Sequence, residues 1–118
     1  MSNDVINIDG IKTKIYFVEK GIIQPLFGLA TVDNTSKGLM GTIKIQKNLP
    51  DKVSKFIKEH EIFHIKDYKH QGGWFMREIR ANIFALIKEP IGFLETTILT
   101  ITNPDRRIYY FKKLLNMN

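Results

Sequence analysis

Three residues that could carry out metal chemistry lie close together in the segment 57–67, which reads IKEHEIFHIKD. His60 and His64 are four residues apart, and Glu61 directly follows the first histidine. Side chains four residues apart on a helix lie on one face, so both imidazoles could bind the same metal ion. Glu61 is rotated by about 100° from His60 and would reach a water molecule on that ion.

This spacing predicts hydrolysis of a peptide bond. Zinc lowers the pKa of a bound water molecule towards about 7. Glu61 would take the proton, the resulting hydroxide would attack the carbonyl, and Glu61 would pass the proton to the leaving amine. The same pattern also arises by chance in helices, with the histidines partly buried beside Phe56 and Phe63. A third protein ligand would favour the catalytic interpretation, because catalytic zinc sites usually have three.

Glu78, in the segment 77–87 with the sequence REIRANIFALI, is a candidate for this third ligand. Two glycines at 72–73 interrupt the helical pattern, and His64 and Glu78 lie at similar distances on either side. Two helices folded back on each other would bring these residues level. A single glutamate on a helix is more often solvated and paired with Lys or Arg, but this mirrored position favours metal ligation.

The neighbours of Glu78 fit a closely packed helix pair. Ala81 and Ala85 are small and would let the two helices approach each other at the metal. Asn82, one turn beyond Glu78, could accept the second ring N–H of His60 and fix the orientation of that ring.

These residues resemble those of the gluzincin type of zinc metallopeptidase. HEIFH at 60–64, followed by E-x-x-A-N at 78–82, looks like the gluzincin pattern of a motif helix and a glutamate helix. The second segment is especially similar to that of the ImmA/IrrE-type peptidases, which reads E-x-x-A-N-x-F-A. The short chain is also similar to the archaeal minigluzincins. The resemblance covers 41–87, about half of the chain.

The resemblance implies a role for each residue of the pattern. Zinc would be bound by His60, His64 and Glu78, Glu61 would be base and acid, and Asn82 would orient His60. The strand 41–47, GTIKIQK, would form the rim that pairs with an extended peptide substrate.

The residue that would stabilise the oxyanion of the reaction cannot be assigned from the sequence. The candidates by chemistry alone are Tyr68, His70, Tyr109 and Tyr110, and surface or packing roles are the commoner ones for such residues.

The elements that must position the site can be read from hydrophobic patterns. Alternating residues around Asp9 and Gly10 predict a hairpin over 4–18. Two further strands are predicted at 25–32 and 41–47, separated by turn-forming residues. The sequence thus predicts a small, mainly antiparallel sheet in the first part of the chain.

Helical patterns dominate the second part of the chain. The predicted helices are the motif helix at 50–69, the glutamate helix at 74–88 and a last helix at 104–115. The segment 91–102 is apolar but rich in β-branched residues, and we interpret it as a helix.

The sequence therefore predicts a single α+β domain of the minimal zincin-like kind over residues 1–118. Its parts would be a strand-rich region at 1–48, the motif and glutamate helices at 49–88, and a C-terminal helical segment at 89–118.

Composition narrows the classes of function. The chain has 118 residues, no cysteine and a formal net charge of +6. Cysteine-ligated zinc and thiolate catalysis are therefore excluded. The lysines are spread along the chain, which favours a solvated surface over nucleic-acid binding. No apolar run is long enough to span a bilayer, and the polar N-terminus does not look like a secretory signal, so we expect a cytoplasmic protein.

The function predicted is that of a zinc-dependent endopeptidase acting on peptide or protein substrates. Two alternatives stay open, a regulatory protein with a non-catalytic zinc site and a basic nucleic-acid-binding module. The apolar segment 103–118 either completes the core or covers the cleft and makes the enzyme latent, in its own molecule or in a self-associated neighbour. In the second case, a carboxylate from Asp105 or from the C-terminus at Asn118 could take the open zinc position.

Overall fold

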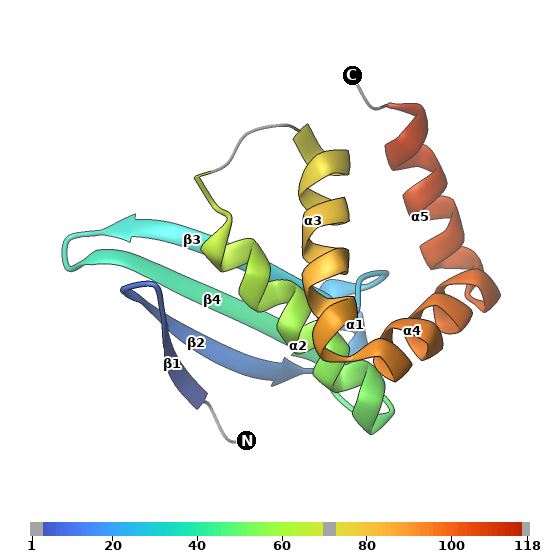
Figure 1. Cartoon of the computed structure of the whole chain (residues 1–118), viewed down its shortest axis with the longest axis horizontal. Coiled ribbons are helices and arrows are strands. Elements are labelled where there is room, and N and C mark those ends of the chain that lie inside the picture. The colour runs from blue at the N-terminus through green and yellow to red at the C-terminus, as the bar shows by residue number, and fades with distance from the viewer. Residues whose placement is uncertain (1–3, 70–72, 117–118) are drawn as a thin grey trace.

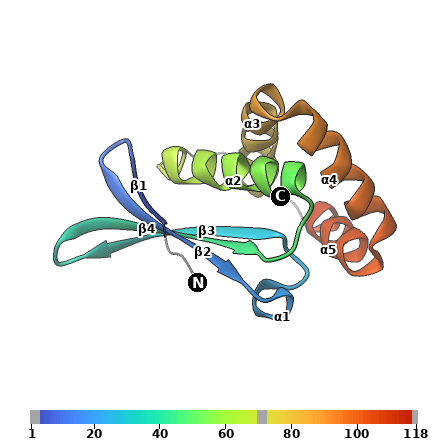
Figure 2. The same ribbon diagram turned by 90° about the horizontal axis from the view of Figure 1, so that it is seen from below.

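The computed structural model describes residues 4–69 and 73–116, which form a four-stranded sheet and a group of helices on one side of it (Figures 1 and 2). The α+β class is confirmed. The elements are β1 (Asp4–Ile8), β2 (Ile11–Val18), α1 (Lys20–Ile23), β3 (Gly28–Thr35), β4 (Gly38–Gln46), α2 (Asp51–Lys66), α3 (Gly73–Lys88), α4 (Pro90–Thr102) and α5 (Pro104–Leu115).

The predicted hairpin forms between β1 and β2, which pair antiparallel. Its turn residues Asp9 and Gly10 have φ values of 50° and 88°. Positive φ at both central residues is the requirement of the two-residue turn that suits the strand twist, and Asp-Gly meets it at little steric cost.

The sheet is mixed, with two antiparallel pairings and one parallel pairing, so the predicted mainly antiparallel arrangement is interrupted only in the middle of the sheet. Its strand order is β1-β2-β4-β3, with β2 and β4 parallel and the two outer pairings antiparallel. The alternation of apolar residues predicts strands but not their direction. The short helix α1 and the strand β3 lie between β2 and β4 in the chain and allow β4 to run parallel to β2.

The position of β4 corrects the predicted rim strand. The segment 41–47 lies largely within β4, which is hydrogen-bonded to β2 on one side and to β3 on the other. Its backbone groups are therefore occupied within the sheet, and it cannot pair with a peptide. The edge strand on this side is β3.

The hydrophobic core lies between the sheet and α2 (Figure 2). Every second residue is buried in the first part of β2 and in the second part of β4, as expected for strands with one covered face. The largest fully buried side chains include Ile15, Ile43 and Ile45 from the strands and Val53 and Ile65 from α2. This packing fixes α2, the helix with the histidines, against the sheet.

The four predicted helical segments form helices α2 to α5, including the ambiguous segment that becomes α4. Gly92 brings α4 close to α2, because a Cβ at this position would clash with the carbonyl oxygen of Lys52. Asn103 caps α5 through its side chain, as its sequence position before Pro104 suggests. Among the described residues, none of the helices combines the length and apolar character needed to cross a membrane.

Candidate metal centre

The site is built on two helices, α2 and α3, that pack against each other. Ala81 and Ala85 of α3 are fully buried, in agreement with a close helix pair. Asp67, which follows α2, accepts two hydrogen bonds from the guanidinium of Arg80, at 3.0 and 2.8 Å. This charged pair ties the end of α2 to α3 and so helps to set the helices relative to each other.

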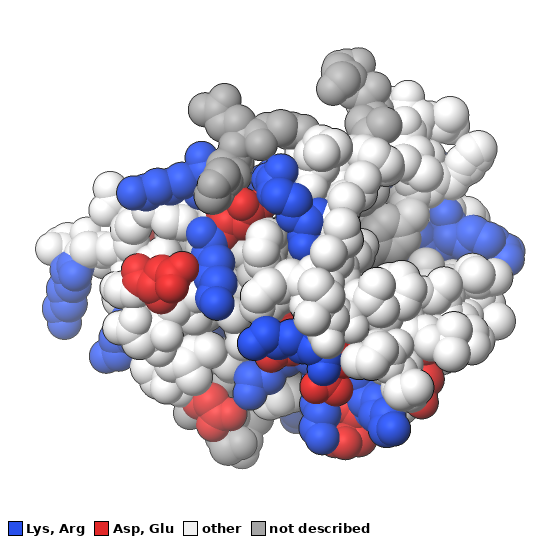
Figure 3. All heavy atoms as spheres, in the orientation of Figure 1, with Lys and Arg blue, Asp and Glu red and all other residues white. Residues whose placement is uncertain are grey.

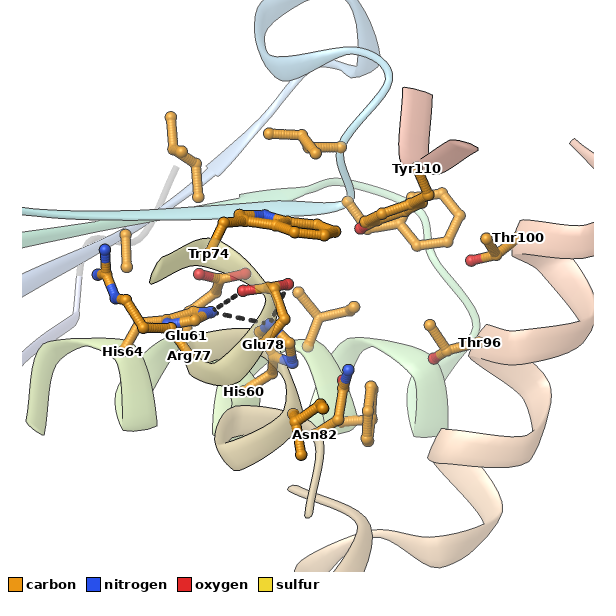
Figure 4. Close-up of a pocket in the computed structure, with 18 of the residues that line it drawn as sticks. His60, Glu61, His64, Trp74, Arg77, Glu78, Asn82, Thr96, Thr100 and Tyr110 are labelled. Atoms are coloured by element: carbon orange, nitrogen blue, oxygen red, sulfur yellow. Dashed lines mark hydrogen bonds and ion pairs between the residues drawn. The ribbon is translucent and has the colours of Figure 1, made fainter. Parts of the chain in front are cut away.

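His60 and His64 from α2 and Glu78 from α3 converge on one point (Figure 4). The two Nε2 atoms are 3.1 Å apart, and Glu78 Oε1 lies 3.4 Å from His60 Nε2. The other carboxylate oxygen of Glu78 contacts His64 Nε2. One ligand atom from each residue lies within 4.8 Å of the others. The structure thus brings together the three residues predicted as metal ligands.

The geometry of these three residues fits a tetrahedral metal ion. Two metal–ligand bonds of about 2.0–2.1 Å at the tetrahedral angle place their ligand atoms about 3.3–3.4 Å apart. The separations of 3.1 and 3.4 Å in the cluster are close to this value, whereas the contact of Glu78 with His64 is shorter, at 2.5 Å. Two imidazoles and one carboxylate also leave one of four positions open for water or substrate. The cluster could therefore hold a divalent metal ion.

The charges around the histidines favour a cation at this point. Burial lowers the pKa of His60, but its hydrogen bond to Glu78 and the negative charges of Glu61 and Glu78 outweigh burial and raise it above 6.5. Burial raises the pKa of Glu78, but its hydrogen bonds to His60 and His64 outweigh burial and lower the pKa to about 2. Glu78 is therefore ionised at neutral pH, as a metal ligand must be.

Glu61 lies beside the cluster without belonging to it (Figure 4). It is 6% exposed, and burial raises its pKa above 4.5 even though the nearby His60 and His64 lower it. A Cβ at Gly28 of β3 would lie 2.9 Å from Glu61 Oε2 and 2.5 Å from Ile57. Only glycine fits here without displacing a side chain, so β3 approaches the Glu61 carboxylate closely.

Asn82, which was predicted to orient His60, lies near the ring of this histidine. Asn82 is near enough to His60 to contribute to the raised pKa of that ring. However, the Nδ1 atoms of both His60 and His64 are buried without a hydrogen-bond partner in the described part of the chain. Asn82 therefore acts on the His60 ring at hydrogen-bonding range, but His60 Nδ1 has no hydrogen bond of good geometry in the described part of the chain.

The cluster opens into a cavity of about 740 Å³. Residues of β3, α2, α3, α4 and α5 line it, so it lies between the sheet edge and the helices. Trp74 of α3 and Tyr110 of α5 lie on the same side of Glu78, and the Tyr110 hydroxyl points into the space beside Trp74 (Figure 4). The volume is that of a ligand-binding site for a molecule of moderate size.

Of the candidates for oxyanion stabilisation, Tyr68, Tyr109 and Tyr110 line the cavity, whereas His70 lies outside the described residues. Tyr110 is the best placed. Its pKa is raised above 10 by burial, and the charges of Glu78 and Glu61 add to the shift while Arg106 opposes it. Its hydroxyl therefore keeps its proton at neutral pH and can act as a hydrogen-bond donor.

The predicted role of the C-terminal segment changes in two respects. The Asp105 carboxylate accepts a hydrogen bond from Gln24 Nε2 at 3.3 Å and is not part of the metal cluster, so it does not take the open metal position of its own molecule. Asn118, the other predicted source of a carboxylate, lies outside the described residues. Phe111, Leu114 and Leu115, which we expected to be buried, are 54%, 48% and 71% exposed.

Two residues of the site were missed from the sequence. Gly28 is one of eight glycines, and nothing in its neighbourhood indicates contact with Glu61. Arg106 appears as an ordinary basic residue in the first turn of a helix, but it is 4% exposed and lines the cavity. Both reach the site only through the packing of β3 and α5.

Comparison with known proteins gives no assignment: no family model, no curated protein and no solved structure matches this chain.

Proposed function

We propose that this protein is a zinc-dependent peptidase of the gluzincin type, with a minimal zincin-like fold. The observation that carries the proposal is a buried carboxylate, Glu61, next to a set of three ligand atoms that does not include it. A structural metal site needs the ligands but has no use for Glu61. A catalytic site needs a base in this position.

The residues of the chain have separate tasks in this proposal. His60, His64 and Glu78 would hold the zinc ion, which when bound supplies an activated water molecule and polarises the substrate carbonyl. Glu61 takes a proton from the attacking water and gives it to the leaving amine. Burial raises the pKa of Glu61, which favours uptake of a proton by this carboxylate.

Tyr110 is proposed as the donor that stabilises the negative charge developing on the carbonyl oxygen. Its O–H lies in the cavity, and the raised pKa keeps it protonated. A hydrogen-bond donor fixed before the reaction in this way stabilises the transition state more than the ground state.

The free edge of β3 is proposed to bind the substrate backbone. In an antiparallel pair, every second residue of a strand is hydrogen-bonded to the partner strand. Phe27, just before β3, is such a residue, because it accepts a hydrogen bond from the Gln46 N–H. Gly28, Ala30 and Val32 are therefore the residues whose backbone groups are not hydrogen-bonded to β4. Their N–H and C=O groups point to the free edge, and all three residues line the cavity. An extended peptide could add to this edge as a further strand.

The experiment that tests the proposal compares peptide hydrolysis by the wild type and by Glu61→Gln. Both proteins are stripped of metal with a chelator, reloaded with zinc and assayed on a mixture of unstructured peptides. We expect hydrolysis by the wild type only with zinc, and a loss of about 100-fold or more in Glu61→Gln with zinc still bound. Tyr110→Phe should keep zinc and lose about 10-fold or more. A Glu61→Gln protein as active as the wild type would refute the mechanism.

A further inference from the structure

The cavity contains a second polar group, the guanidinium of Arg106 from α5. It lies over the ring of Phe27, 3.6 Å from the ring centre. Its Nε donates to Thr100 Oγ1 at 3.1 Å, its Nη1 to the Pro25 carbonyl oxygen at 3.0 Å, and its Nη2 to the Tyr110 hydroxyl at 3.5 Å. The side chain is thus held on several sides and almost completely buried.

These partners satisfy hydrogen bonds of Arg106 but not its charge. All three acceptors are neutral, and no carboxylate among residues 4–69 and 73–116 forms an ion pair with Arg106. A guanidinium has five N–H groups, of which these bonds use three. Buried cations in proteins are usually paired with an anion, because burial removes their hydration. Burial indeed lowers the pKa of Arg106 below its usual value.

The charges around the whole cavity also favour the binding of an anion. Apart from the histidines, its charged lining residues are Glu61, Glu78, Arg77 and Arg106. Arg77 also has no ion pair or hydrogen bond in the described part of the chain, and its Nε is buried. Two arginines and a divalent ion give four positive charges against two carboxylates. A loaded site would therefore carry an excess of two positive charges.

We propose that Arg106 is a specificity residue that binds a carboxylate of the substrate, close to the bond that is cleaved. This inference rests on the proposed function, because Arg106 and the metal cluster line the same cavity. A carboxylate matches the planar guanidinium and supplies the missing counter-charge. Tyr110 lines the same cavity and accepts a hydrogen bond from Arg106, so it connects Arg106 to the proposed reaction site.

Such a carboxylate has two sources in a peptide, the free C-terminus or the side chain of an aspartate or glutamate. In the first case the enzyme would remove residues from the C-terminal end. In the second it would cleave beside acidic residues within a chain. The chemistry of recognition is the same, so the experiment must separate the sources.

The test uses two pairs of peptides that each differ by one carboxylate. One pair has a free C-terminus or a C-terminal amide. The other is amidated and has Glu or Gln next to the cleaved bond. We expect the zinc-loaded wild type to prefer the carboxylate member of one pair by about 10-fold or more in kcat/KM, as for a charge-assisted hydrogen-bonded contact. The pair that shows the preference identifies the source.

Variants then assign the preference to Arg106. Arg106→Gln should reduce the preference to about threefold or less, and Arg106→Lys should retain part of it, because a point charge replaces the planar fork. Arg77→Gln is the matched control, since it removes the same charge from another part of the cavity lining and should keep the preference. Zinc content and the thermal unfolding midpoint show whether each variant is folded. A preference lost equally in Arg77→Gln would overturn the assignment to Arg106.

Binding separates this inference from the proposed function. Zinc-loaded Glu61→Gln is titrated calorimetrically with the same four peptides. If the wild type hydrolyses none of them, yet the carboxylate peptide binds about 10-fold tighter and Arg106→Gln removes this difference, the peptidase fails and the carboxylate site stands. If neither pair differs in binding or in hydrolysis, the carboxylate site is refuted, whatever the activity. The refuting outcome is measured on the wild type and Glu61→Gln alone, so the carboxylate site can be refuted even if the Arg106 variants do not fold.

Discussion

Glu61 and Gly28 show how single residues from separate elements make the site. Glu61 belongs to α2, and the absence of a side chain at Gly28 leaves room for its carboxylate beside β3. The position of the proposed base therefore depends on the width of the gap between strand and helix. A small change in this gap would move Glu61 relative to the ligands without touching any of them.

Gly28→Ala is the corresponding prediction. The new Cβ would lie 2.9 Å from Glu61 Oε2, so the carboxylate or the strand must shift. We expect about 10- to 100-fold lower peptide hydrolysis with zinc content unchanged, because misplacement by about 1 Å has effects of this size. Gly21→Ala is the control, since a Cβ there meets nothing within 4 Å and should leave the activity unchanged. Equal activity of Gly28→Ala and the wild type would contradict the importance of this contact.

For single residues of the site, the sequence predicts well those positions that depend on local spacing along a helix. The four-residue step from His60 to His64 and the mirrored place of Glu78 predicted three side chains that converge in the structure. The contacts of Gly28 and Arg106 depend on residues far away in the chain, such as Glu61 and Pro25. No local pattern encodes these contacts.

Among the elements, β3 takes part in the site together with α2 and α3. It is the edge strand of the sheet on the side of the cavity, and its outward backbone groups are those of Gly28, Ala30 and Val32. Hydrophobic alternation predicted the strands but not their order or direction, and the substrate was placed on β4 only through the family resemblance. The parallel pairing of β2 with β4 is what leaves β3 at the edge.

The role of β3 can be tested with proline. Ala30→Pro removes an N–H that points to the free edge, so the sheet should remain intact. Loss of one backbone hydrogen bond to the substrate corresponds to about 0.5–1.5 kcal/mol, so kcat/KM should fall by up to about tenfold. Thr31→Pro is the contrast, since it removes an N–H bonded to β4 and should lower the unfolding temperature. Unchanged hydrolysis by a folded Ala30→Pro protein would argue against peptide binding at this edge.

The whole molecule has an uneven surface. Among the described residues, sixteen large hydrophobic side chains are exposed, and α3, α4 and α5 carry five, four and four of them. Figure 3 shows a broad uncharged area on the side of α4 and α5, with Lys and Arg scattered elsewhere on this face. Apolar surface of this extent is typical of a region that contacts another molecule. Self-association through this surface stays a prediction.

Latency through the C-terminal segment is a prediction about the activity of the whole molecule. Tyr109 and Leu114 line the cavity, so the C-terminal end of α5 lies beside it. A chain that ends at Leu115 keeps Arg106 and Tyr110, and we expect it to hydrolyse peptides at least severalfold faster than the full chain. If the inhibition acts between molecules, dilution should raise the specific activity of the full chain only. Equal specific activity of both proteins at every concentration, with zinc bound, would rule out latency of this kind.

The most direct test of the central claim is the molar ratio of zinc to protein in three purified proteins, the wild type, His64→Ala and Glu61→Gln. His64 supplies one of the three converging ligand atoms, and Glu61 supplies none. We predict about one zinc ion per chain in the wild type and in Glu61→Gln, and almost none in His64→Ala. Equal zinc content in the wild type and His64→Ala, or loss of zinc in Glu61→Gln, would contradict a three-ligand site with Glu61 as its base.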